Sequence, residues 1–65
     1  MKIHELLITY NLIDKHDRAK VDGCRYRSVR NSRLDCYEKL CWFLTESDAS
    51  KVGYIEVLSI EVNPL

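Results

Sequence analysis

One helical segment lies between segments of strand periodicity, and this order limits the folds open to the chain more than any other feature. Within residues 33–46, apolar groups recur at helical spacing: Leu34, Tyr37, Leu40, Cys41 and Leu44. Ser32 and Asp35 fit the capping-box pattern that begins a helix. We expect this stripe, widened by Cys36 and Phe43, to be the helix face that packs on a sheet.

Three segments have the periodicity of strands. Residues 2–13 carry apolar groups on both faces, which is typical of a central strand. Residues 23–30 alternate strictly, with Arg25 and Arg27 on the same side, and this pattern predicts a half-buried strand with one wet face. Residues 54–62 are rich in β-branched side chains and predict the third strand.

The predicted order is strand, strand, helix, strand, with residues 14–22 and 46–53 as loops. We place the third strand beside the first and antiparallel to it, because the first is apolar on both faces and the second carries the most charge. The predicted fold class is α+β: a three-stranded, mainly antiparallel sheet of order 2-1-3 with one helix packed on one face. It forms a single domain over residues 1–65.

A single helix covers only one face of such a sheet. Four apolar residues are expected on the second face: Ile3, Leu7, Ile55 and Val57. Left uncovered, they would attract a partner or a second copy of the chain.

The charges of the chain are segregated, although its ten Lys/Arg and ten Asp/Glu cancel. Residues 14–33 hold seven basic and three acidic groups, a balance of +4. Residues 34–65 hold two basic and six acidic groups, a balance of −4. Such a molecule has an oriented electric field even though its net charge is zero.

Four arginines of the basic part are predicted to form a ridge: Arg25, Arg27, Arg30 and Arg33. The guanidinium fork suits carboxylates, phosphates and aromatic faces. Adding two aromatic anchors, Tyr26 and Trp42, completes the predicted partner-binding set. The alternative is a solvated strand face whose arginines pair with acids of the same chain.

No pattern in the sequence predicts catalysis. The three cysteines, Cys24, Cys36 and Cys41, are an odd number without zinc-site spacing, and we expect free thiols. His4 and His16 are the only histidines, and the two glycines form no phosphate-binding loop. We therefore expect a protein that is not an enzyme and that has no metal site and no cofactor.

The function expected from these features is the binding of another protein. A chain of 65 residues buries only about 60% of its unfolded surface, which favours a surface site over a deep one. In size class alone, the chain resembles small phage- or mobile-element-encoded proteins that block host enzymes or defence complexes, anti-CRISPR proteins among them. The resemblance implies inhibition by surface occlusion. Two alternatives stay open: a nucleic-acid-binding accessory protein that uses the basic ridge, and a homodimeric structural or regulatory module that pairs sheet faces or edges.

We expect the protein to be cytoplasmic, in the producing or the host cell. The sequence has no signal-peptide pattern and no run of about 20 apolar residues, so no membrane partner is predicted. Its composition, 46% hydrophobic and 31% charged, is that of a folded protein. Free thiols also agree with a reducing compartment.

Overall fold

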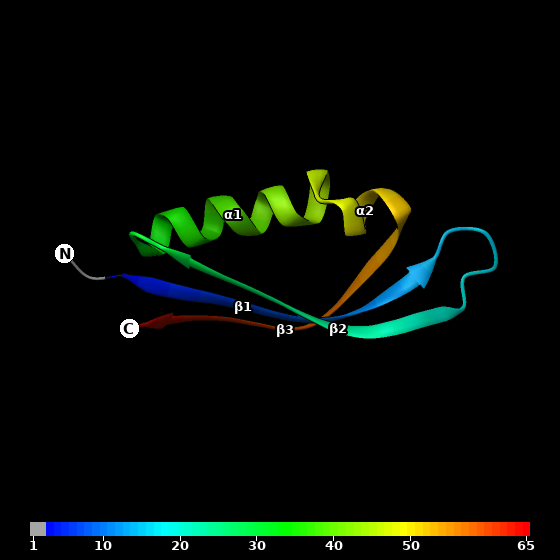
Figure 1. Cartoon of the computed structure of the whole chain (residues 1–65), viewed down its shortest axis with the longest axis horizontal. Coiled ribbons are helices and arrows are strands. Elements are labelled where there is room, and N and C mark those ends of the chain that lie inside the picture. Colours follow the sequence, from blue (N-terminus) through cyan, green and yellow to red (C-terminus); the bar gives the residue numbers. More distant parts are fainter. Residues whose placement is uncertain (1–2) are drawn as a thin grey trace.

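The computed structural model describes residues 3–65, apart from the side chains of residues 20 and 21. Its elements, in chain order, are β1 (His4–Asp14), β2 (Lys20–Arg30), α1 (Arg33–Glu46), α2 (Asp48–Val52) and β3 (Gly53–Pro64). The strands form one sheet of order β2-β1-β3, and both neighbouring pairs are antiparallel. Figure 1 shows α1 lying along one side of this sheet. The α+β class and the strand order predicted from the sequence are confirmed.

The connection between β1 and β2 is shorter than expected, because β2 begins at Lys20 and leaves residues 15–19 as the loop. Asp14 organises this loop: its carboxylate oxygen Oδ1 accepts from the backbone N–H groups of His16 at 2.7 Å and Asp17 at 3.2 Å. The residue predicted to open the first strand, Lys2, lies outside the described residues.

Both helices begin at a serine cap. The Ser32 side chain accepts from the backbone N–H of Asp35 at 3.1 Å, as the capping pattern predicts. Ser47 accepts from the backbone N–H of Ser50 at 3.2 Å and donates its own hydroxyl to the Phe43 carbonyl. A second short helix therefore follows, and the prediction of a loop over residues 46–53 was wrong.

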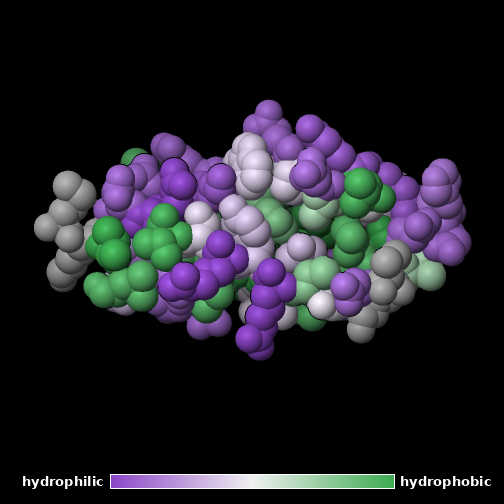
Figure 2. All heavy atoms as spheres, in the orientation of Figure 1, coloured by the Kyte–Doolittle hydropathy of each residue, from purple (hydrophilic) through white to green (hydrophobic). Residues whose placement is uncertain are grey.

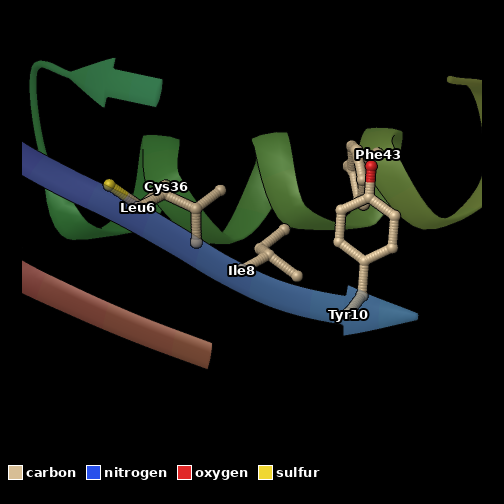
Figure 3. Packing of buried hydrophobic residues seen from close by; sticks show 5 residues of the cluster. All are labelled: Leu6, Ile8, Tyr10, Cys36 and Phe43. Atoms are coloured by element: carbon tan, nitrogen blue, oxygen red, sulfur yellow. The ribbon is translucent and has the colours of Figure 1, made fainter. Parts of the chain in front are cut away.

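The face of α1 that packs on the sheet also differs from the predicted one. The fully or nearly buried core is Leu6, Ile8, Tyr10, Cys36 and Phe43, and Figure 3 shows these side chains packed between α1 and β1. Four members of the predicted buried stripe are instead exposed: Leu34, Tyr37, Cys41 and Leu44. The reason is aromatic packing, since the Phe43 ring stacks on Tyr26 (centroids 4.4 Å apart) and meets Tyr10 edge-on at 5.2 Å.

A β-bulge at Leu58 determines which face each β3 side chain occupies. Thr9 pairs with Ser59 and Tyr10 pairs with Val57, so Leu58 has no partner on β1. Residues directly opposite each other in an antiparallel pair share a face. The apolar residues of β3 that oppose the core side of β1 are Ile55, Val57, Ile60 and Val62. The two glutamates, Glu56 and Glu61, lie on the other side, which we call the open face.

Two residues expected on the second face are therefore elsewhere. Ile55 and Val57 lie on the α1 side. The prediction placed them on the other face because it assumed that side chains alternate along the whole of β3, without the bulge at Leu58. Leu7 does lie on the open face, opposite Arg27 and Glu61. Ile3 precedes β1 and is exposed.

Candidate functional site

Two of the predicted arginines lie side by side on the open face of β2. Arg25 is opposite Thr9 and Arg27 is opposite Leu7, and both arginines are exposed. They are two residues apart on one strand, so their Cα atoms are about 7 Å apart. This spacing presents two guanidinium groups side by side at a solvent-facing edge of the sheet.

Arg27 is held by an ion pair within the open face. Its Nε donates to the Glu5 carboxylate, and the Arg27 side chain remains 56% exposed while that of Glu5 is 15% exposed. A pair this exposed is worth less than about 1 kcal/mol, so it orients the guanidinium without preventing an exchange of partners. Among the described residues, Arg25 has no ion pair.

The opposite edge of the open face is acidic. Glu61 is opposite Leu7, and Glu56 is opposite Asn11, whose amide Nδ2 donates to Glu56 Oε1 at 2.8 Å. The charge segregation of the sequence thus becomes a gradient across the sheet, with arginines on β2 and glutamates on β3. Because the three strands lie side by side, opposite charges are separated by about 10 Å.

The other two predicted arginines do not join this pair. Arg30 is opposite His4, and the alternation of β2 places it on the α1 side of the sheet. Arg33 is the first residue of α1, and its Nη2 donates to the Tyr37 hydroxyl at 3.3 Å. The ridge predicted from the sequence is divided between two surfaces, because successive strand residues point to opposite faces and the helix begins beyond the sheet.

The two predicted aromatic residues belong to the packing between α1 and β2. Tyr26 is half-buried against Phe43, and its ring centroid is 6.4 Å from that of Trp42. Trp42 is 39% exposed and carries the Lys39 ammonium 3.8 Å from its ring centroid. Tyr26 lies on the face opposite to its neighbours Arg25 and Arg27, so the structure does not bring these three together.

The cysteines and histidines are dispersed. Cys36 is buried, Cys24 is half-buried, Cys41 is exposed, and all three are free thiols. Burial raises the pKa of the Cys36 thiol, and the charge of Arg30 only partly offsets this effect. Burial likewise raises the pKa of Tyr10, with the Cys24 thiol beside it as the next cause. Within residues 3–65, no three His, Cys, Asp or Glu side chains gather as metal ligands.

The structure also exposes an apolar surface whose α1 residues were predicted to be buried against the sheet. Trp42 lies near Tyr26 of β2, and Tyr37 and Leu44 lie on the opposite flank of α1, which points toward β3. We call the exposed residues on this side the apolar corner: Leu34, Tyr37, Cys41 and Leu44 of α1 with Val57 and Ile60 of β3. Figure 2 shows hydrophobic side chains reaching the surface in separate groups on the face in view.

Comparisons with protein-family models, with curated proteins and with solved structures found no match for this chain. Among residues 3–65, no helix is long and apolar enough to span a membrane.

Proposed function

We propose that the chain is a non-catalytic protein-binding module that inhibits a partner by occluding its surface. The exposed pair Arg25 and Arg27 on the open face is the observation that supports this proposal most. It acts in the cytoplasm of the producing or host cell, in the manner of the small phage- or mobile-element-encoded inhibitors that the chain resembles in size.

An acidic protein surface is the partner chemistry that this pair fits best. Each guanidinium presents a planar fork to a carboxylate, and arginines are among the residues that carry most of the energy in protein interfaces. A carboxylate of the partner would compete with Glu5 for Arg27 and would meet Arg25 without displacing an ion pair.

Nucleic acid is a weaker candidate for the same face. Glu5, Glu56 and Glu61 lie on the open face together with the arginines, so a phosphate backbone that crosses the three strands would meet repulsion. A protein surface carries both signs of charge and can match an arrangement with arginines at one edge and glutamates at the other.

The test begins with affinity capture of the partner from a lysate of the native host, followed by binding measurements with the purified partner. Replacing both arginines (Arg25→Glu with Arg27→Glu) should raise the dissociation constant at least about 100-fold, as expected for two anchor contacts of about 1.4 kcal/mol or more each. The matched control reverses Arg30 and Arg33, which changes the net charge equally on other surfaces, and should bind within a few-fold of wild type.

Equal loss of binding in both double variants would contradict a specific role for the open face, and so would unchanged binding in the first. Thermal unfolding of each variant shows whether its fold is intact. A shift of DNA or RNA mobility at low salt that weakens steeply as salt is added would support the nucleic-acid alternative instead.

A further inference from the structure

The apolar corner is a second surface, and the proposed partner binding does not use it. Arg25 and Arg27 lie on the open face, whereas the corner lies on the α1 side of the sheet. Its wall is the flank of α1 that carries Tyr37 and Leu44, with Leu34 and Cys41 higher on the helix, and its floor is formed by Val57 and Ile60 of β3.

The corner exists because one helix covers three strands incompletely. A helix is about 10 Å wide and strands are about 4.8 Å apart, so α1 shields two strands and leaves the third uncovered. The aromatic contacts of Phe43 with Tyr10 and Tyr26 hold α1 over β1 and β2. Val57 and Ile60 therefore remain 38% and 43% exposed although they face the α1 side.

We propose that a second copy of the chain covers this corner and that the protein is a homodimer. A two-fold axis parallel to α1 places the α1 helices of the two copies side by side. Each helix then covers the part of β3 that is left uncovered in the other copy. Tyr37 and Leu44, near the side of the helix, then face the same residues of the second copy. Leu34 and Cys41, higher on the helix, face its Val57 and Ile60. The corner of one copy thus fits into the corner of the other, and no further helix or strand is needed. This interface differs from the pairing of sheet faces or edges that the sequence suggested for a homodimer.

The exposed apolar area agrees with what such a dimer needs. Leu34 is 67% exposed, Tyr37 and Ile60 are each 43% exposed, and Leu44 and Val57 are each 38% exposed. With roughly 200 Å² for a large side chain, these five residues present about 450 Å² per copy, about a tenth of the total surface of 4569 Å². Two copies thus bury about 900 Å² of apolar surface before Cys41 and the polar rim are added, close to the roughly 1,000 Å² that a specific interface requires.

The net charge of the chain does not oppose this association. Each copy has a net charge of zero, so two copies do not repel each other at long range. The six residues of the corner carry no charge, and the one cation bonded to them, Arg33, whose Nη2 donates to the Tyr37 hydroxyl at 3.3 Å, has to stay in contact with water at the rim of the dimer interface.

Sedimentation equilibrium of the full chain from about 1 to 500 µM tests the proposal. Wild type should be dimeric, and Leu44→Glu and Ile60→Glu, one from each side of the corner, should each raise the dimer dissociation constant at least about 30-fold. The matched control is Ser59→Glu, which adds the same charge to an exposed site on the open face of the same strand and should leave the dimer unchanged. Circular dichroism shows whether each variant is folded.

A disulfide tests the direction of the axis. In a background with Cys24→Ser and Cys41→Ser, Leu44→Cys should form a covalent dimer on oxidation, because equal positions of the two helices face each other. Glu46→Cys in the same background, on the opposite flank of α1, should not form one. A monomeric wild type, a dimer insensitive to both corner substitutions, or a dimer lost in Ser59→Glu would overturn the proposal. Partner binding by the open face would survive any of these results, so the two proposals fail separately.

Discussion

At the scale of single residues, Asp14 does the most to shape the loop between β1 and β2. Its carboxylate accepts two backbone N–H groups, from His16 and Asp17. Its backbone closes the same loop through Asp14 N–H to the Ala19 carbonyl at 2.9 Å and Arg18 N–H to the Asp14 carbonyl at 3.0 Å. The loop also holds Arg18 at a φ of 60°, a left-handed conformation that costs a non-glycine residue about 1 kcal/mol. The two hydrogen bonds that the Asp14 carboxylate accepts from His16 and Asp17 favour its charged form, and they lower the pKa of Asp14 from its usual 3.8.

The lowered pKa of Asp14 predicts an acid-sensitive contribution to stability. A carboxyl group whose pKa is lower in the folded than in the unfolded state stabilises the fold above its unfolded pKa, and this contribution is lost as pH falls through the folded pKa. Asp14→Asn keeps an acceptor oxygen but cannot titrate, so its urea midpoint should fall less than that of wild type between about pH 5 and pH 2. Parallel declines in the two proteins would show that Asp14 contributes no such effect.

At the scale of secondary-structure elements, Gly53 fixes how closely β3 approaches β1. A Cβ atom at this position would lie 2.5 Å from the Ile13 carbonyl oxygen and 2.9 Å from Leu12 Cδ1. Because the carbonyl belongs to the backbone of the central strand, the clash cannot be relieved by turning a side chain. Glycine is therefore needed at Gly53 for a close contact between strands, not for a special φ, which is an ordinary −159°.

Gly53→Ala should lower the free energy of unfolding by about 1–3 kcal/mol, the usual cost of forcing an extra carbon into a packed site. Gly23→Ala is the matched control. A Cβ there would lie 3.6 Å from Asn11 Oδ1, an ordinary contact. Urea denaturation compares the two variants, and equal losses would show that the close approach of β3 does not limit stability.

Sequence patterns predict the elements of this chain better than their packing. The alternation of β2 and the Ser32 cap are local signals, and the strands, the helix start and the order β2-β1-β3 agree with them. The orientation of α1 depends on Phe43 meeting Tyr10 and Tyr26, two residues remote in sequence. Two apolar stripes of α1 compete for the core, one with Cys36 and Phe43 and the other with Tyr37 and Leu44. The helical spacing of these residues does not decide which stripe is buried.

The candidate site was predictable only where a single strand carries it. Arg25 and Arg27 share a face because they are two residues apart, and the sequence shows this directly. Arg30 and Arg33 continue the basic run in sequence. Arg30, however, lies on the other face of β2, and Arg33 belongs to α1. The apolar corner was missed for a related reason, since the bulge at Leu58 reverses the alternation on which Val57 was placed.

At the scale of the whole molecule, the chain has few buried side chains for its length. Five apolar side chains are buried in the described part, and a domain of this size rarely gains more than about 3–5 kcal/mol from its core alone. A second copy that covers the apolar corner would add to the stability of each chain by mass action.

The melting temperature should therefore depend on concentration. A 100-fold increase in concentration is worth about 2.7 kcal/mol per dimer, or about 1.4 kcal/mol per chain, which corresponds to a rise of about 5–10 °C for a domain of this length. Differential scanning calorimetry between about 5 and 500 µM measures this rise, and Ile60→Glu should show a smaller one because its dimer is weaker. A wild-type melting temperature independent of concentration would mean that a single chain is the folding unit.

The bulge at Leu58 divides β3 into two short strands joined at one unpaired residue. Odd-numbered residues before the bulge and even-numbered residues after it face α1. A single insertion or deletion elsewhere in β3 would exchange its isoleucines and glutamates between the two faces over part of its length. Leu58 itself has no partner on β1 and is 58% exposed, so the change of phase falls at a residue outside the pairing. The single residue between Val57 and Ser59 therefore decides which side chains each half of β3 presents to α1 and which it presents to the open face.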